Sequence, residues 1–316
     1  MTVSIVEKLN IEENYPLRNV SNFHIGGPAK YYVQIDNDEQ LASVLQWANE
    51  QRLPLMILGG GTNVLISDKG FDGLVIHLQY QLVSIEGTEV LCSADINLME
   101  LVNMTVDKGL TGIEFAAGIP GSVGGGVVGN AGAYGGQLSD VVVSAEVMDR
   151  TGEVHILSNQ QLNFTYRHSL LKEKSWLLLR VTLKLEQGDR EEAMAKVARY
   201  NADRWSKQPT EPSAGCTFKN IIITDEIIKL LQKHEWEIPE QYFKYNKIPV
   251  AWIIDRLGLK GKRIGDAELS SLHGNFIINK GQAKAEDVVT LISLIKQEVR
   301  DQLGIQLEEE VRYLGF

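Results

Sequence analysis

The residues of this 316-residue chain with the clearest chemical meaning are the glycines of a stretch at 118–136. The stretch reads GIPGSVGGGVVGNAGAYGG, so nearly half of it is glycine. Glycine has no Cβ atom, so the backbone can adopt positive φ angles and approach a ligand closely. The amide N–H groups of such a loop can point together at an anion, as in phosphate-binding nests. A second run, GGGTN at 59–63, follows the apolar segment 55–58. Two loops of this kind predict a nucleotide cofactor that contains a diphosphate.

The same stretch contains a match to the dinucleotide fingerprint G-x-G-x-x-G, at residues 124–129. Glu146 and Asp149 even lie near the distance expected of a ribose-binding acid. However, the fingerprint requires a hydrophobic strand directly before its first glycine. The preceding residues read AGIPGSV and cannot form such a strand. We therefore interpret the match as a consequence of the glycine-rich composition, which argues against a Rossmann fold.

Composition and charge restrict the class of protein. With 44% hydrophobic and 23% charged residues, the chain has the material for two or three globular domains. A net charge of −10 without a Lys/Arg block argues against nucleic-acid binding. Two cysteines, Cys92 and Cys216, are too few for a disulfide framework and indicate a reducing compartment. No signal-peptide core is visible in Met1–Lys8, and no apolar stretch is long enough to span a membrane. We expect a cytoplasmic monomer without membrane insertion.

Hydrophobic periodicity predicts the elements that must position the loops. Helices are expected at 38–50, 98–108, 189–207, 224–234, 249–257 and 285–303. Strands are expected at 55–58, 64–66, 74–78, 141–148, 176–185, 275–279 and 307–314. The charged helix at 189–207 ends before Pro209, because proline stops a helix. The main domain boundary is placed near residues 190–200.

A set of segments in a fixed order carries a family resemblance. They read NFHIGGPA (22–29), GGGTNVL (59–65), GIEFAAGIPGSVGG (112–125), NAGAYG (130–135), YRHS (166–169), GCTFKN (215–220), GLKG (258–261), IG (264–265), HGNF (273–276) and LEEEV (307–311). In this order they resemble the UDP-N-acetylenolpyruvoylglucosamine reductases, the flavoenzymes of early peptidoglycan synthesis. The resemblance covers nearly the whole chain.

The resemblance implies an α+β fold with an FAD-binding part of the vanillyl-alcohol-oxidase type. It implies two FAD-binding subdomains, at 1–79 and 80–195, and a C-terminal substrate-binding domain at 196–316. It also implies the reaction: NADPH reduces FAD, which passes hydride to UDP-N-acetylglucosamine enolpyruvate and gives UDP-N-acetylmuramate. A tyrosine-bearing lid of the longer subclass has no counterpart here, which indicates the shorter subclass. The aromatic-rich segment 221–257 is expected to form an extra packed helix rather than a cover over the sugar nucleotide.

Two catalytic positions follow from the resemblance at YR and GCTF. Arg167 matches the residue that stabilises the enolate carboxylate, for which a planar, permanently charged guanidinium is suited. Cys216 stands where the family usually has the proton-donating serine. A thiol has a pKa near 8.5 and is mostly protonated at neutral pH, so it can still donate a proton to the enolate. The replacement of serine by Cys216 is expected to affect the rate of the reaction and the sensitivity of the enzyme to oxidation.

The third catalytic position lies in a run of three glutamates. The family pattern places the functional acid directly before an apolar residue, here Val311, which selects Glu310. On a strand Glu308 and Glu310 would share a face and Glu309 would point away. Alternation by itself therefore excludes Glu309 but not Glu308.

The binding residues also follow from matched positions. Lys207 matches the basic residue near the substrate diphosphate, Asn220 a substrate-contacting amide, and Tyr166 and His273 are further substrate contacts. No metal site is expected, because His24, His168 and His273 have no second histidine, cysteine or carboxylate at metal-binding spacing. The cofactor-binding residues implied by the family are Gly59, Gly60, Gly61, Thr62, Asn63, Gly118, Ile119, Pro120, Gly121, Ser122, Asn130, Gly132 and Ala133.

Two other functions share some of these features. A related flavin oxidase acting on an alcohol or sugar would keep the cofactor loops but often tethers its flavin covalently. A binding protein that has lost catalysis would keep the loops alone, and only Cys216 favours it. Retention of Arg167, Glu310 and Lys207 argues against a mere binder.

Overall fold

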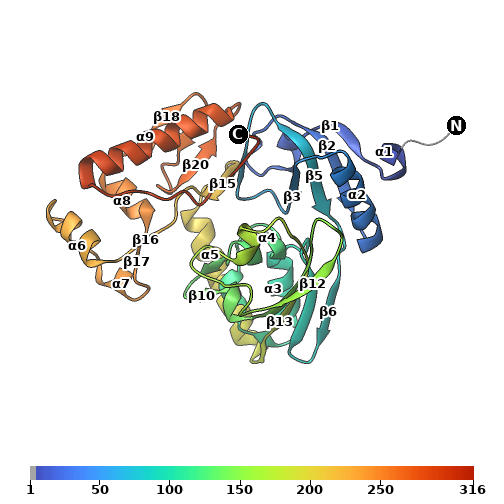
Figure 1. Ribbon diagram of the computed structural model, residues 1–316. Helices are drawn as coiled ribbons and strands as arrows, with labels where there is room; N and C mark the ends of the chain where they lie inside the picture. Colours follow the sequence, from blue (N-terminus) through green and yellow to red (C-terminus); the bar gives the residue numbers. More distant parts are fainter. Residues whose placement is uncertain (1–4) are drawn as a thin grey trace. The chain divides into compact units, whose positions relative to one another are not determined.

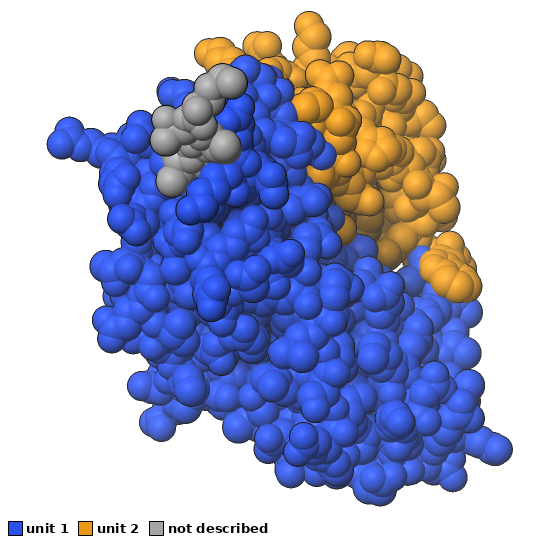
Figure 2. Space-filling view, turned by 90° about the vertical axis from the view of Figure 1, so that its right-hand side faces the viewer, with its two compact units in different colours: residues 1–15, 28–60, 71–204 blue, residues 16–27, 61–70, 205–316 orange. Residues whose placement is uncertain are grey.

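The computed structural model describes residues 5–316 and divides into two compact units (Figure 2). The first unit consists of the chain up to Tyr15, Pro28–Gly60 and Phe71–Arg204. The second consists of Pro16–Gly27, Gly61–Gly70 and Trp205–Phe316. The chain thus contributes two short N-terminal segments to the second unit before its C-terminal third begins. The expectation that no signal peptide is present concerned Met1–Lys8, and residues 1–4 of that segment lie outside the described residues.

One sheet of the first unit is built around parallel strands, in the order β1-β2-β5-β3. β2 and β3 both run parallel to β5. The strands are β1 (Glu12–Pro16), β2 (Pro28–Ile35), β3 (Leu55–Leu58) and β5 (Phe71–Leu78). Helix α2 (Asp38–Glu50) follows β2 and runs beside this sheet (Figure 1). It begins where the Asn37 side chain accepts a hydrogen bond from the Gln40 N–H at 2.8 Å, which satisfies one of the first unbonded amides of the helix.

The second sheet of the first unit is antiparallel, in the order β12-β11-β13-β7-β6. Its strands are β6 (Val83–Glu86), β7 (Glu89–Ser93), β11 (Val142–Met148), β12 (Val154–Ser158) and β13 (Leu177–Lys184). One hydrophobic core joins both sheets and the helices. The helices and short strands are α1 (Ile5–Lys8), α3 (Leu98–Asp107), α4 (Val123–Val128), α5 (Arg190–Lys207), β8 (Leu110–Thr111), β9 (Gly132–Ala133), β10 (Gly136–Gln137) and β14 (Glu186–Gln187).

The second unit has its own core and a four-stranded sheet in the order β15-β20-β19-β18. Helix α9 (Ala285–Leu303) lies alongside this sheet (Figure 1) and ends at Gly304, whose left-handed φ of 72° suits glycine. Near the C-terminus β21 pairs in parallel with β4 from the N-terminal third. The elements are β4 (Val64–Ile66), β15 (Ser213–Cys216), β16 (Ile221–Ile222), β17 (Lys247–Ile248), β18 (Arg263–Ile264), β19 (Ala267–Leu269), β20 (Phe276–Asn279), β21 (Arg312–Leu314), α6 (Asp225–Gln232), α7 (Glu240–Phe243) and α8 (Val250–Arg256).

The sequence-based elements are confirmed with one correction. The predicted helices at 38–50 and 285–303 have the observed bounds. The single strand predicted at 307–314 is wrong in its first part, because only Arg312–Leu314 forms β21. The residues before it pair irregularly with another segment, as described below. The division into three domains at residues 79 and 195 stays a prediction.

Membrane-spanning helices were sought among residues 5–316. None of the helices there is both long enough and apolar enough to cross a membrane.

Candidate active site

The two predicted glycine loops meet inside the first unit. Gly59 and Gly60 follow β3, and a Cβ atom built on Gly59 would lie 2.5 Å from the Ser122 Oγ. A Cβ on Gly60 would lie 2.9 Å from the Cα of Gly121, which is closer than side chains can approach. The Ser122 hydroxyl caps α4 by accepting a hydrogen bond from the Gly125 N–H at 3.2 Å. This packing is possible only with glycine, and it leaves bare backbone where a diphosphate would bind.

Gly118 is a third position of this cradle that requires glycine. Its φ is +69°, and a Cβ atom there would lie 2.6 Å from the Cδ of Arg204 and 2.9 Å from the Oδ1 of Asn201. Both neighbours lie on α5. The segment that continues through Ile119 and Pro120 to Gly121 is thereby held against that helix. The cradle fits a group that approaches the backbone directly.

The remaining residues of the first loop belong to the second unit. Gly61 has φ +63°, and a Cβ there would lie 2.0 Å from the Val20 carbonyl oxygen. Thr62 follows it, and Asn63 donates from Nδ2 to the Glu310 carbonyl at 3.2 Å. The five residues 59–63, grouped by sequence into one loop, are therefore divided between two units after Gly60. Their shared role in cofactor binding stays a prediction.

Asn130 ties the second glycine loop to the segment before Arg167. It is 1% exposed and has a left-handed φ of 43°. Its Nδ2 donates to the Thr165 carbonyl at 3.0 Å, and its Oδ1 accepts from the Ser139 N–H at 3.0 Å. Gly132 and Ala133 form β9, which pairs with β10. The family-implied cofactor residue thus also has a structural function.

Arg167 stands on a turn of two residues. Thr165 and His168 exchange backbone hydrogen bonds of 3.0 and 3.2 Å, which leaves Tyr166 and Arg167 at the tip. The φ of Arg167 is +56°, a left-handed conformation that costs a non-glycine residue about 1–2 kcal/mol. Its guanidinium donates to the Gly132 carbonyl at 3.1 Å and, at 3.5 Å, to the Asn130 carbonyl, and lies 5.3 Å from the Tyr166 ring centroid. The structure brings Arg167 to the glycine loop 118–136.

Cys216 and Glu310 are brought together inside the second unit although they are far apart in the sequence. Cys216 ends β15 and pairs with Phe276 of β20, and it is partly exposed. The next residue, Thr217, accepts at its carbonyl from the Glu310 N–H at 2.8 Å and from the Val311 N–H at 3.4 Å. Two residues thus oppose one, which is the pattern of a β-bulge. The bulge explains why the predicted strand 307–314 is interrupted, since it breaks the regular alternation of side chains.

The other two glutamates of the run have ion-pair partners of their own. Glu308 pairs with Lys219 at 2.9 Å and is exposed. Glu309 pairs with Lys296 at 2.6 Å and accepts a hydrogen bond from the Tyr313 hydroxyl. Glu308 thus faces a surface lysine, and the choice of Glu310, which rests on the family pattern, stays a prediction.

Asn275 is a site-forming residue that the sequence reasoning missed. It is 1% exposed. Its side chain accepts from the Phe218 N–H at 2.9 Å and donates to the Phe218 carbonyl at 2.8 Å, while its own carbonyl accepts from the Thr217 N–H at 2.8 Å. A buried amide therefore holds both sides of the residues that follow Cys216. In the sequence Asn275 belongs to HGNF, a segment of the family resemblance in which a role was expected of His273 alone.

The expected substrate-binding residues are distributed over three elements. Lys207 ends α5. Asn220 follows the Cys216 segment, and its Oδ1 accepts from the Val250 N–H at 3.3 Å, at the start of α8. His273 precedes β20, and its Nδ1 accepts from the Asn275 N–H at 3.2 Å. Burial, and next the charge of Lys260, lower the pKa of His273, which favours the neutral ring.

The aromatic side chains of the segment 221–257 pack on each other. Trp252 meets the Trp236 and Tyr242 rings edge-on, with centroids 5.5 and 5.9 Å apart. The Arg256 guanidinium lies 4.9 and 5.1 Å from the centroids of the two tryptophans. The three aromatics pack against the core of the second unit, whereas Phe243 is exposed. The packing supports the interpretation of this segment as added structure.

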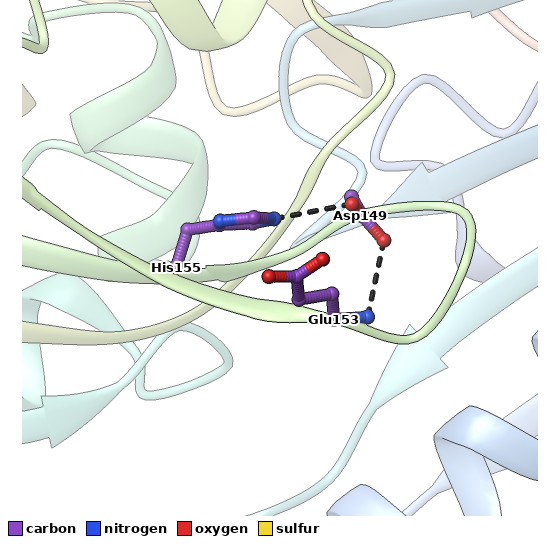
Figure 3. A group of neighbouring side chains, drawn as sticks. All are labelled: Asp149, Glu153 and His155. Carbon is purple, nitrogen blue, oxygen red and sulfur yellow. Dashed lines mark hydrogen bonds and ion pairs between the residues drawn. The ribbon is translucent and has the colours of Figure 1, made fainter.

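One cluster outside these segments has the composition of a metal site. Asp149, Glu153 and His155 lie near the β11–β12 turn (Figure 3). Asp149 already accepts hydrogen bonds from Thr151, from the Glu153 N–H at 3.1 Å and from His155 at 3.1 Å. The bonds from Thr151 and His155 hold the pKa of Asp149 well below its usual range. They account for the cluster as a brace of the turn, and the absence of a metal stays a prediction.

The chain matches known families over both units. A family model described as UDP-N-acetylenolpyruvoylglucosamine reductase, C-terminal domain, matches residues 208–314, and one described as FAD binding domain matches residues 29–158. The chain is 38% identical over 304 residues to UDP-N-acetylenolpyruvoylglucosamine reductase of Caldanaerobacter subterraneus subsp. tengcongensis, covering 96% of this chain and 93% of that protein. It is 37% identical over 314 residues to the enzyme of the same name from Clostridium novyi, covering 99% and 94%.

A solved structure is similar over the same extent. The crystal structure of UDP-N-acetylenolpyruvylglucosamine reductase from Thermus caldophilus superimposes with a TM-score of 0.77 at 32% identity, covering 96% of this chain and 98% of that one. The expected α+β fold with an FAD-binding domain and a separate C-terminal domain is confirmed, and the vanillyl-alcohol-oxidase type of the FAD-binding part stays a prediction.

Proposed function

The chain belongs to the UDP-N-acetylenolpyruvoylglucosamine reductase family, and from this premise we propose how its own residues carry the reaction. The protein is an FAD-dependent oxidoreductase that reduces UDP-N-acetylglucosamine enolpyruvate to UDP-N-acetylmuramate with NADPH, a step of peptidoglycan precursor synthesis. When bound, FAD takes a hydride from NADPH and delivers it to the enolpyruvyl double bond. The protein must bind the cofactor, hold the substrate carboxylate and supply a proton.

Cofactor binding is assigned to the glycine loops. Gly59, Gly60 and residues 118–122 form a cradle whose glycine-only packing supports close approach of a diphosphate to backbone N–H groups. Thr62 and Asn63 extend this assignment from the second unit, and residues 130–133 complete it. The fit rests on the close approach of the two loops, since a Cβ atom at Gly60 would lie 2.9 Å from the Gly121 Cα.

Arg167 is assigned to the substrate carboxylate. Hydride addition to one carbon of the double bond places negative charge on the other carbon and on the carboxylate joined to it. A guanidinium holds such a group through two parallel hydrogen bonds and remains charged. A fixed donor of this kind commonly lowers a barrier by about 3 kcal/mol. The anchoring of the Arg167 guanidinium on the Gly132 carbonyl supports a fixed direction.

Cys216 is assigned the proton that completes the product. Its thiol would protonate the carbon that bears the developing charge, in the role of a general acid. Glu310 is assigned to the same substrate end, as the acid that the family pattern places there. The observation that carries this pair is the 2.8 Å hydrogen bond from the Glu310 N–H to the Thr217 carbonyl, which joins the two segments inside one unit.

The remaining assignments concern the rest of the substrate and the setting of the enzyme. Lys207 is assigned to the diphosphate, Asn220 and Tyr166 to substrate contacts, and His273 to a further contact as a neutral ring. We further propose a cytoplasmic monomer of the shorter subclass, in which Cys216 replaces the usual serine.

The test separates the two half-reactions. The flavin of the purified protein is bleached anaerobically with NADPH, and UDP-N-acetylglucosamine enolpyruvate is then added. We expect Cys216→Ala to bleach at the parent rate but to recover the oxidised spectrum about a hundredfold more slowly, since general acids contribute about 10²–10⁴. Cys216→Ser is expected to keep substantial activity. Cys92→Ala, which removes the buried second thiol, is the matched control and is expected to behave as the parent.

Several results would contradict the proposal. Recovery of Cys216→Ala at the parent rate would remove Cys216 from the proton-donor role. Flavin that survives acid precipitation with the protein would indicate an oxidase, and bleaching without recovery in the parent would leave a binding protein. A protein that takes up no FAD would contradict the whole assignment.

A further inference from the structure

The conformation of Arg167 raises the question of what holds it in place. Its left-handed φ of +56° at the second position of a two-residue turn is one that glycine adopts more readily. A strained residue of this kind persists only where its surroundings over-determine it. The guanidinium is held by the Gly132 carbonyl, so the side-chain end is anchored to the glycine loop. The backbone end needs a separate support.

That support comes from Lys172. Its Nζ donates to the carbonyl oxygen of Arg167 at 2.7 Å, a short, charge-assisted hydrogen bond. Lys172 ends a 3-10 helix at Leu170–Lys172, five residues beyond the strained position. The ammonium therefore reaches back to the peptide group whose orientation the left-handed conformation sets.

The base from which Lys172 reaches is fixed in the core. Ser169 is fully buried, and its hydroxyl donates to the Val128 carbonyl at 2.8 Å. Leu171 is 5% exposed, and the Leu170 N–H donates to the carbonyl of the buried Leu162 at 2.8 Å. A side chain that rises from a rigid base can hold a strained turn, whereas one from a mobile loop cannot.

We propose that Lys172 is a positioning residue that holds the Arg167 backbone so that the guanidinium faces the substrate carboxylate. The proposal rests on the proposed function, because the hydrogen bond from Lys172 to the Arg167 carbonyl matters for the reaction only if Arg167 binds substrate. Without the ammonium, the turn can relax to other φ and ψ angles, and the guanidinium moves with it. Lys172 then affects only the half-reaction that involves substrate.

The experiment compares three substitutions in the FAD-loaded protein. Lys172→Met removes the donor at similar length, and Lys172→Arg retains a cation that can reach the carbonyl. Glu173→Gln is the matched control, because it removes the neighbouring His168–Glu173 pair of 3.2 Å without touching Arg167. Flavin bleaching by NADPH, recovery by substrate, steady-state kcat and KM, and thermal unfolding are measured for each.

We expect Lys172→Met to bleach at the parent rate and to recover about ten- to a hundredfold more slowly, as misplacement of a binding group by about 1 Å can cost a hundredfold. Lys172→Arg should regain a large part of this loss, and Glu173→Gln should match the parent. Recovery of Lys172→Met at the parent rate would overturn the proposal. An equal slowing of both half-reactions with a lowered unfolding temperature would also overturn it, since it would indicate general support of the fold.

A further variant keeps failure of this proposal distinct from failure of the proposed function. Arg167→Met should recover at least as slowly as Lys172→Met. Recovery of Arg167→Met at the parent rate would contradict the role of Arg167 itself. Slow flavin recovery in Arg167→Met together with parent-like recovery in Lys172→Met would support the proposed function and contradict only the positioning role of Lys172.

Discussion

In the first unit Arg167 stands on a strained two-residue turn and donates to the Gly132 carbonyl, and elsewhere in that unit Gly60 packs against the Gly121 backbone. In the second unit Cys216 lies at the end of a strand, and its neighbours are held by strand pairing and by the buried amide of Asn275. The first arrangement depends on glycines, which have no Cβ atom. The second depends on the side chain of Asn275, which both donates and accepts a hydrogen bond. The two units therefore respond to different kinds of substitution.

Under the proposed function this difference has a physical origin, because the two units have different tasks. A diphosphate is best approached by bare N–H groups, which require close packing without Cβ atoms. A proton donor and an acid must instead be held at fixed mutual positions, and hydrogen-bonded strands do this well because their register is strongly specified. Steric substitutions should thus affect the first unit, and the removal of a hydrogen-bonding amide should affect the second.

The largest effect should come from a side chain placed in the glycine cradle. A Cβ on Gly60 would lie 2.9 Å from the Gly121 Cα, so Gly60→Val must push the two loops apart. We expect FAD affinity to fall at least about a hundredfold, which corresponds to roughly 2.8 kcal/mol. Equilibrium titration of the apoprotein with FAD measures this.

Gly87→Ala separates cofactor loss from general instability. Gly87 has φ +60° but no atom within 4 Å of its Cβ position, so alanine strains a turn without a clash. This control should lose some stability and keep its flavin. Normal FAD affinity in Gly60→Val would break the comparison, because the cradle would then tolerate side chains.

Removal of the Asn275 side-chain amide in the second unit should affect FAD binding less and should slow the reaction with substrate. Asn275→Leu leaves the Phe218 N–H and carbonyl without their partners, at a cost of about 1–3 kcal/mol for each group. We expect lower stability in urea, retained FAD, and slower flavin recovery by substrate.

Asn279→Leu is the matched control for that substitution. Asn279 is 6% exposed and ends β20, the strand that begins directly after Asn275, and its side chain donates to the Phe23 carbonyl at 3.1 Å. The Asn279→Leu variant should lose about as much stability as Asn275→Leu but should show faster flavin recovery by substrate. Equal rates for both variants would show that Asn275 supports the fold of the second unit alone.

The smallest effect concerns pH and compares one histidine from each unit. Burial lowers the pKa of His77 in the first unit and of His273 in the second. Each group therefore takes up its proton more readily in the unfolded chain. The stability it contributes is complete above the unfolded pKa of about 6.5 and is lost as pH falls through that value towards the folded pKa.

Urea unfolding between pH 7.5 and 5.5 checks this. Stability should fall with pH in the parent, and His273→Gln should flatten part of that slope. His77→Gln should flatten another part, although it also loses the 2.8 Å hydrogen bond between His77 and Tyr32. An unchanged slope in both variants would place the pH dependence elsewhere.

The glycine loops and most of the elements could be predicted from the sequence because their signals are local. Helix α9 has its apolar stripe within its own residues and a glycine directly after it, so its bounds could be predicted. The glycines at 59–61 and 118–136 were visible for the same reason. The identity of Arg167, Cys216 and Glu310 came from an ordered set of motifs, which is also carried by the sequence alone.

Only the tertiary structure decided which residues distant in the sequence meet within each unit. The strand predicted at 307–314 failed because its first part is set by a bulge against Thr217, about ninety residues away along the chain. The ion pairs of Glu308 with Lys219 and of Glu309 with Lys296 were not predicted, because no local pattern indicates that these residues are close. The hydrogen bonds of Asn275 and Lys172 were not predicted either, because they depend on partners that only folding brings near. Local conformational preferences depend on neighbouring residues and can be predicted from the sequence. Hydrogen-bond partners that are distant in the sequence are determined only when the chain has folded.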